Sequence, residues 1–206
     1  SAGLNELKPE RSSTIELGTK WDVLDEKLSL TAALFQNERK DAQIEIAPNI
    51  YEQAGKTRVR GLELGVSGQI TPKWRVFGGY TYMDSELLKG AYDGVNKGDP
   101  NTPKHSFSLW STYALTPRFT VGGGAYYVGK TFGGNQGTAG GGQWEVYMPS
   151  YWRFDAMASY RFNDRLSLRL NALNLTDKVY YKRTNGVHHA DFGPGRQFIL
   201  SANLRY

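Results

Sequence analysis

Residues 151–181 read YWRFDAMASYRFNDRLSLRLNALNLTDKVYY, and two stretches of this segment alternate strictly between apolar and polar side chains. On one side, the first stretch carries Trp152, Phe154, Ala156, Ala158, Tyr160 and Phe162. After Asn163-Asp164 the alternation restarts, and its apolar side carries Leu166, Leu168, Leu170 and Ala172. Because successive side chains of a pleated strand point to opposite faces, this pattern predicts two β-strands.

The same period recurs along the chain and predicts nine strands in all, with no long amphipathic helix between them. The predicted strands cover residues 12–22, 27–46, 50–70, 73–86, 104–116, 118–132, 149–163, 165–178 and 194–206. Tight links at 23–27, 71–73, 116–118 and 163–164 alternate with a short link at 47–49 and long polar or glycine-rich links at 87–103, 133–148 and 180–193. All the tight turns therefore lie at one end of the sheet. Short turns at one end and long loops at the other are typical of an outer-membrane barrel.

Composition limits the classes of protein that fit. Of 206 residues, 39% are hydrophobic, and no run approaches the roughly 20 apolar residues that a membrane helix needs. A transmembrane barrel remains compatible, because only alternate residues of its strands meet lipid. The absence of cysteine argues against a disulfide scaffold or a cysteine zinc site. The net charge of +5 suits an anionic partner, but no basic helix or lysine-rich run favours nucleic acid.

The apolar face of the sheet could be covered by a second sheet, as in a soluble sandwich, or by lipid. In residues 151–163, aromatic side chains stand at both ends of the apolar side, and Ala156 and Ala158 stand in the middle. Two aromatic girdles around a lipid-exposed middle would produce this order, whereas a sandwich core gives no reason for it. The opposite side is polar and suits a wet lumen: Arg153, Asp155, Arg161, Arg169 and Asn171. We therefore predict that lipid covers the apolar face.

Four segments in this order resemble sequence patterns of the TonB-dependent siderophore receptors. They are LKPERSSTIELGTKWD (7–22), TRVRGLELGVSGQITPKWRVFGGYTYMDSE (57–86), LNALNLTDKVYY (170–181) and GPGRQFILSANLRY (193–206). The resemblance extends over essentially the whole chain. Within that family, YMPSYWRFDAMASYR (147–161) and HHADFGPGR (188–196) look most like the ferric-catecholate receptors.

The resemblance implies an all-β fold: a 22-stranded transmembrane antiparallel β-barrel of the outer-membrane type, with an N-terminal plug domain and a TonB box. These 206 residues depart from it, because they hold no plug domain, no TonB box and an odd number of predicted strands. Bacterial single-chain barrels have even strand counts, and an open sheet in lipid would leave two unpaired edges. We therefore expect residues 1–206 to be the C-terminal part of a receptor barrel domain, whose first strand pairs with a missing upstream strand.

The resemblance also implies a function in the bacterial outer membrane. Such a receptor binds a ferric siderophore, here of the catecholate type by preference, and imports it with TonB-coupled energy. It is not an enzyme and has no covalently bound cofactor, and iron enters only within the siderophore ligand. Its implied partners are TonB, through the missing N-terminal region, and outer-membrane lipid and lipopolysaccharide around the barrel. The barrel assembly machinery would recognise the last strand, which ends on the aromatic Tyr206.

A ferric catecholate is large, aromatic and strongly anionic, so its pocket should offer Arg or Lys charges and Tyr or Trp ring faces. Side chains of these types on or beside the predicted outward loops are the candidate ligand contacts: Trp144, Tyr147, Tyr151, Tyr180, Tyr181, Lys182 and Arg183. The alternative is that the aromatic residues belong to the interfacial girdle and the cations bind lipopolysaccharide phosphates.

Three other readings of the sequence carry less weight. A passive porin-like channel is the alternative function, and a full-length gene without a plug domain would favour it. A barrel hydrolase could use His105, Ser111 and Asp155, but no G-x-S-x-G or comparable arrangement supports one. A metal site at His188, His189 and Asp191 is disfavoured, because adjacent residues on a strand face opposite ways. We expect no metal ligands and no catalytic residues.

Overall fold

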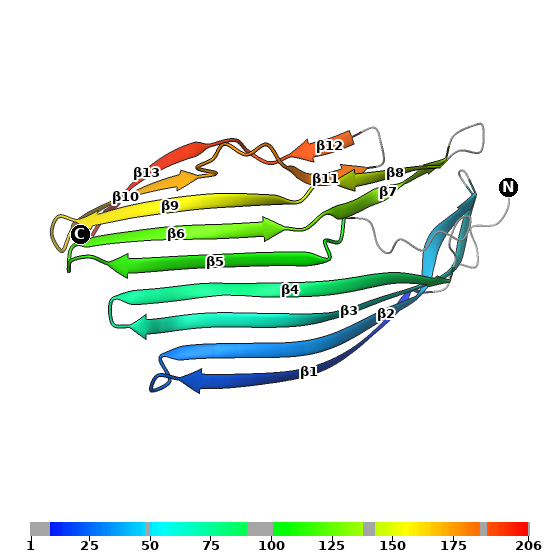
Figure 1. The fold of residues 1–206 in the computed structure, drawn as a ribbon, viewed down its shortest axis with the longest axis horizontal. Coiled ribbons are helices and arrows are strands. Elements are labelled where there is room, and N and C mark those ends of the chain that lie inside the picture. Colours follow the sequence, from blue (N-terminus) through cyan, green and yellow to red (C-terminus); the bar gives the residue numbers. More distant parts are fainter. Residues whose placement is uncertain (1–8, 48–49, 90–100, 138–142, 186–188, 206) are drawn as a thin grey trace.

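The computed structural model describes residues 9–47, 50–89, 101–137, 143–185 and 189–205. Nine strands of this part form one sheet in the order β1-β2-β3-β4-β5-β6-β9-β10-β13, and every neighbouring pair is antiparallel (Figure 1). The strands are β1 (Arg11–Val23), β2 (Leu28–Ala47), β3 (Ile50–Thr71), β4 (Trp74–Lys89), β5 (His105–Ala114), β6 (Phe119–Val128), β9 (Tyr151–Arg161), β10 (Leu166–Leu173) and β13 (Gln197–Leu204). Each of the nine predicted strands corresponds to one of these.

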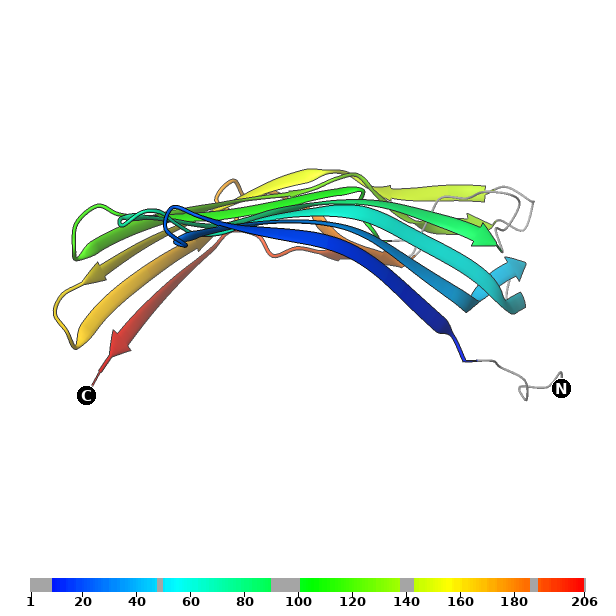
Figure 2. The ribbon, with the colours of Figure 1, turned by 90° about the horizontal axis from the view of Figure 1, so that it is seen from below.

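The sheet is a single curved layer, and Figure 2 shows its arched profile. Among the described residues, no helix has the length and apolar character that crossing a membrane requires. Neither face of the arch is covered by a second sheet of described residues. The packed core that a soluble sandwich places between two sheets is therefore missing from this part of the chain.

One face of the sheet is apolar along its whole width. Residues paired directly across antiparallel strands share a face, so the register places Leu17, Leu34 and Leu62 side by side at one edge. At the other edge Ala158, Leu170 and Leu200 form an equivalent row. Leu17 is 75% exposed and Leu200 is 70% exposed. Exposed leucines in continuous rows suit hydrocarbon surroundings rather than water.

Aromatic side chains border this apolar face at both ends of the strands. At the end of the long connections, the Trp152 ring lies 5.0 Å from that of Tyr127 and 6.0 Å from that of Phe107. At the opposite end, the Tyr160 ring lies 4.8 Å from that of Phe162. This distribution confirms the two predicted girdles, which are typical of strands that meet a membrane interface at each end.

Three of the four tight turns share one hydrogen-bonding pattern. The side-chain oxygens of Thr71, Thr116 and Asn163 each accept hydrogen bonds from the backbone N–H groups two and three residues later, over 2.9–3.3 Å. Such side-chain turns reverse the chain without a long loop. All the tight turns lie at one end of the sheet, at the left of Figure 1, as the sequence predicts.

Our prediction that residues 133–148 and 180–193 form loops was wrong. Two further hairpins lie there: β7 (Thr131–Gly137) with β8 (Gln143–Met148), and β11 (Tyr181–Asn185) with β12 (His189–Phe192). The strand predicted at 118–132 accordingly ends at Val128. The strand predicted at 165–178 ends at Leu173, because Asn174 adopts a φ of 52° and turns the chain out of the sheet.

The face opposite the apolar one is mostly polar, although apolar side chains, Ile199 and Met83 among them, also stand on it. Phe77 stands on it and is 67% exposed. The register pairs Phe77 with Trp110, and Trp110 in turn with Gly124. A Cβ atom on Gly124 would approach the Trp110 ring to 2.7 Å, so the indole lies close against a wall of glycines. An apolar patch therefore interrupts the mostly polar face.

Candidate functional site

The two extra hairpins lie at the end of the sheet opposite the tight turns, and we call β7–β8 and β11–β12 together the outward hairpin pair (Figure 1). Strand β11 packs against both β7 and β8. The Thr184 hydroxyl on β11 donates a hydrogen bond to the Gly133 carbonyl on β7 over 3.1 Å. Six of the seven predicted ligand contacts lie on this pair or directly beside it: Trp144, Tyr147, Tyr180, Tyr181, Lys182 and Arg183. Tyr151 begins β9.

Lys130, directly before β7, places a cation over an aromatic ring of β8. The Lys130 ammonium lies 4.2 Å from the centroid of the Tyr147 ring, and the Phe132 ring lies 5.5 Å from it. Tyr147 is 38% exposed, so part of its surface remains open to a ligand. Our sequence reasoning missed Lys130, because a single lysine inside the strand predicted at 118–132 carries no distinctive pattern. Trp144 lies in β8, but its side chain is outside the described part of the structure.

The β11–β12 hairpin carries two of the predicted ligand contacts that are cations, and they differ in their ion pairing. The Arg183 guanidinium forms an exposed ion pair with Asp191 at 3.2 Å. Exposed pairs of this kind contribute only about 0–1 kcal/mol, so an anionic ligand could displace Asp191 at little cost. Lys182 is exposed and has no ion pair within the described ranges. The Tyr181 ring lies 4.8 Å from that of Phe192, which is 59% exposed.

Tyr151 and Tyr180 are packed together beneath the hairpins. Their rings are stacked with centroids 4.5 Å apart, and Tyr180 is only 3% exposed. Nearby on β9, Arg153 pairs with the buried Asp155 at 3.1 Å and places its guanidinium carbon 4.4 Å from the Tyr126 ring. The ligand contact assigned to Tyr180 stays a prediction, and its burial gives it a supporting position under β11.

Asn174 organises the segment that leads from β10 to Tyr180. Its side chain is 1% exposed and donates to the carbonyls of Lys178 and Pro194 over 3.0 and 3.1 Å. Its Oδ1 accepts from the Lys178 N–H over 2.9 Å. Its own N–H donates to Asp155 Oδ1 over 2.8 Å. The asparagine of the N-L-x-D stretch thus ties three chain segments together below the outward hairpin pair.

Asn101 links the connection before β5 to both hairpins. Its Nδ2 donates to the Thr184 carbonyl over 3.1 Å, and its Oδ1 accepts from the Thr184 N–H over 3.0 Å. Its backbone N–H donates to the Phe132 carbonyl over 2.7 Å. Our sequence reasoning missed Asn101. Its contacts with Thr184 span 83 residues in the chain, and no periodic pattern indicates them.

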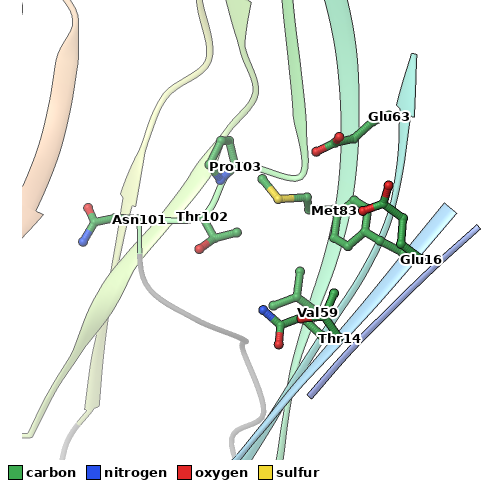
Figure 3. Close-up of a pocket in the computed structure, with 10 residues that line it drawn as sticks. Thr14, Glu16, Val59, Glu63, Met83, Asn101, Thr102 and Pro103 are labelled. Carbon is green, nitrogen blue, oxygen red and sulfur yellow. The ribbon is translucent and has the colours of Figure 1, made fainter. Parts of the chain in front are cut away.

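A cavity of about 420 Å³ lies between strands β1–β4 and the segment 101–103 (Figure 3). The carboxylates of Glu16 and Glu63 line it, together with apolar side chains such as Met83 and Pro103. No lysine or arginine belongs to this lining among the described residues. An anionic ligand is therefore matched better by the cations of the outward hairpin pair than by this cavity.

The hydrolase and metal readings gain no support from the geometry. His105 Nδ1 hydrogen-bonds the Tyr80 hydroxyl at 2.8 Å, and the Ser111 hydroxyl accepts from the Trp74 indole at 2.8 Å. Asp155 is engaged by Arg153 and Asn174, so the three residues have separate partners. His188 lies outside the described residues. No group of three His, Cys, Asp or Glu side chains that could hold a metal ion is found in the described ranges.

Comparisons with known proteins agree with this geometry. Residues 1–175 match the family model described as "TonB dependent receptor-like, beta-barrel". The chain is 47% identical to the "probable TonB-dependent receptor BfrD" of Bordetella pertussis, over 98% of this chain and 28% of that protein. Its structure resembles the closed form of the ferric-catecholate import receptor Fiu from Escherichia coli K12, with a TM-score of 0.86 and 38% identity over 100% of this chain and 29% of the other.

A second solved structure is about as similar. The siderophore receptor PiuA of Acinetobacter baumannii gives a TM-score of 0.84 and 40% identity, over 100% of this chain and 30% of the other. The chain therefore spans less than a third of the length of the proteins that it matches.

Proposed function

Since the chain belongs to the TonB-dependent receptors, as an arc of their outer-membrane β-barrel, we propose that the whole protein binds a ferric siderophore at the cell surface and imports it with TonB-coupled energy. The main support is the outward hairpin pair, which gathers cations and ring faces at the end of the long connections. A ferric catecholate is the favoured ligand. Fiu of Escherichia coli, a catecholate siderophore receptor by name, is 41% identical over the whole chain.

We place residues 1–206 in the C-terminal part of the barrel domain. In the sheet of described residues, β1 and β13 stand at the two edges, and each has one neighbour. Exposed edges are untenable in lipid, so further strands would pair with both. The 67% exposure of Phe77 on the polar face supports a plug domain inside the barrel, through which TonB would act.

The two faces of the sheet suggest the remaining partners. The apolar face would contact outer-membrane lipid, with lipopolysaccharide at its outer girdle. The last strand would present its alternating side chains to the barrel assembly machinery. No nucleic acid is needed for this function, and iron would be held by the siderophore rather than by protein ligands.

The ligand would be held from two sides by the outward hairpin pair. On β7–β8, the Tyr147 ring with Lys130 beside it suits an electron-rich catechol with negative oxygens. On β11, Lys182 and Arg183 would supply charge, the latter by exchanging Asp191 for the ligand. Trp144, Tyr151 and Tyr181 complete the proposed contact set, and the buried Tyr180 would support it through its stacking on Tyr151.

A direct binding experiment tests this function. Full-length receptor in detergent is expected to bind at least one ferric catecholate with a dissociation constant of about 1 µM or lower, measured by quenching of tryptophan fluorescence. A flat titration across several ferric catecholates would remove the catecholate assignment. Growth on the same chelates as the only iron source should depend on the receptor and on the proton-motive force.

The energy dependence also separates import from the porin-like alternative. A passive channel would continue to admit the chelate after the proton-motive force is dissipated. An active receptor would still bind the chelate but would stop accumulating it.

Charge reversal on β11 tests the proposed contact set. Lys182→Glu is expected to weaken ferric-catecholate binding about tenfold, equivalent to about 1.4 kcal/mol, because a negative charge replaces a positive one beside an anionic ligand. Lys73→Glu, on the tight turn at the other end of the sheet, is the matched control and should leave affinity unchanged. Equal affinities for the two variants would take Lys182 out of the site.

A further inference from the structure

We infer that Asn101 is a positioning residue that joins the β7–β8 and β11–β12 hairpins into one unit and thereby sets the spacing of the groups on them. We call the hydrogen bonds of Asn101 to both hairpins the joint, and this joint is observed in the chain itself. Its consequence for a ligand rests on the proposed function.

The side chain of Asn101 behaves like one more peptide group beside β11. Its amide pairs with both backbone groups of Thr184, as a donor over 3.1 Å and as an acceptor over 3.0 Å. Its backbone N–H reaches the Phe132 carbonyl on β7 over 2.7 Å. A single residue from the connection before β5 thus bonds three backbone groups on two different hairpins.

Asparagine suits this position for two reasons. Asn101 has a φ of 62°, in the left-handed region that asparagine tolerates better than most residues. Its amide also carries a donor and an acceptor side by side, which the two backbone groups of Thr184 require. Aspartate would keep the acceptor but turn an oxygen toward the Thr184 carbonyl. Glycine would keep the backbone conformation but lose the side chain.

The contact between the two hairpins is closely packed around Thr184. Thr184 is 8% exposed, so water does not compete freely for these hydrogen bonds. Its hydroxyl donates to the Gly133 carbonyl over 3.1 Å. A Cβ atom on Gly133 would overlap this hydroxyl. The two hairpins therefore lie close together here, and Asn101 bonds both of them at this contact.

This joint matters because the proposed ligand groups are divided between the hairpins. Lys130 and Tyr147 belong to one side, and Lys182 and Arg183 belong to the other. Binding groups held at a fixed spacing lose less conformational freedom when the ligand arrives. A hairpin pair that moved independently would bind the same ligand more weakly.

Hydrogen exchange of the full-length receptor, followed by mass spectrometry, tests the joint without any ligand. In Asn101→Gly and in Asn101→Asp, peptides covering 131–137 and 181–185 are both expected to exchange about tenfold faster or more. Asn163→Gly is the matched control, because Asn163 also bonds two backbone N–H groups with its side chain, but at the tight-turn end. It should leave both peptides unchanged.

The results separate the joint from a local role and from misfolding. Faster exchange in both hairpins, with unchanged exchange in β1–β4, supports the inference. Unchanged hairpins in Asn101→Gly, or a change in 181–185 alone, overturns it. If Asn101→Gly also loosens β1–β4, the milder Asn101→Asp decides by the same criterion.

A ligand titration then tests the consequence. Ferric-catecholate affinity is expected to fall about tenfold in Asn101→Gly, and an unchanged affinity overturns the positioning role. If the wild-type receptor binds no ferric catecholate, the proposed function fails. The exchange experiment still decides whether Asn101 joins the hairpins.

Discussion

Full-length receptor that carries Gly68→Ala is expected to unfold at clearly lower urea concentration than the wild type, with a loss of about 2–6 kcal/mol in unfolding free energy. Gly68 has a φ of 136°, a conformation that residues with a side chain rarely adopt. An added Cβ would overlap the Lys27 carbonyl oxygen and lie 3.0 Å from the Leu28 Cα. The clash involves backbone atoms, so no side-chain rotation relieves it.

The same carbonyl explains why the position matters to the sheet. The Lys27 oxygen accepts a hydrogen bond from the Gln69 N–H over 2.7 Å, which fastens β3 to the turn between β1 and β2. Gly18→Ala is the matched control, because its added Cβ would meet no atom closer than 3.6 Å. We expect it to change stability by less than about 0.5 kcal/mol. Equal urea midpoints for the two variants would contradict the assigned strain.

The second large effect is expected at Asn174. Asn174→Ala removes three side-chain hydrogen bonds and leaves the Lys178 N–H and the carbonyls of Lys178 and Pro194 without these partners. Because Asn174 is 1% exposed, little water can replace the lost bonds, and we expect a loss of about 3–5 kcal/mol. Thermal unfolding of full-length receptor in detergent, followed by heat-dependent gel migration, measures this change.

We expect the Asn174→Ala substitution to weaken ligand binding at the proposed site as well. The segment that it holds leads to Tyr180, whose ring stacks on Tyr151 under β11. We therefore expect siderophore affinity to fall together with stability. Asn171→Ala is the matched control, because no side-chain hydrogen bond of Asn171 is found among the described residues. A melting temperature of Asn174→Ala equal to that of Asn171→Ala would show that the three bonds contribute little.

Much of the sheet could be predicted from short segments of sequence. Strict alternation places Leu170 on one face and Arg169 on the other whatever the rest of the chain does, because the pleat has a period of two. Thr71, Thr116 and Asn163 similarly carry their own turn-forming oxygens, so these three tight turns were predictable without any tertiary contact.

The outward hairpins escaped prediction for a physical reason. The segment at 133–142 is rich in glycine and lacks an apolar alternation, so it resembles a loop. The pairing of β7 with β8 follows no periodic pattern of side chains, since a short hairpin beyond the nine-stranded sheet needs no continuous apolar face. The sequence therefore placed the predicted contacts Tyr147, Lys182 and Arg183 at the correct end of the sheet, opposite the tight turns. It did not predict the strands that carry them.

By itself, the sequence determined what repeats along the chain: nine strands, their two faces, the end that carries the tight turns, and the family pattern. Tertiary structure alone decided what joins segments far apart: the bonds of Asn101 to Thr184, the burial of Tyr180 and the Lys130–Tyr147 pair. Period and turn chemistry are local properties of a few residues. No local sequence pattern indicates a side chain that bonds the backbone 83 positions away, because that contact depends on how the intervening strands fold.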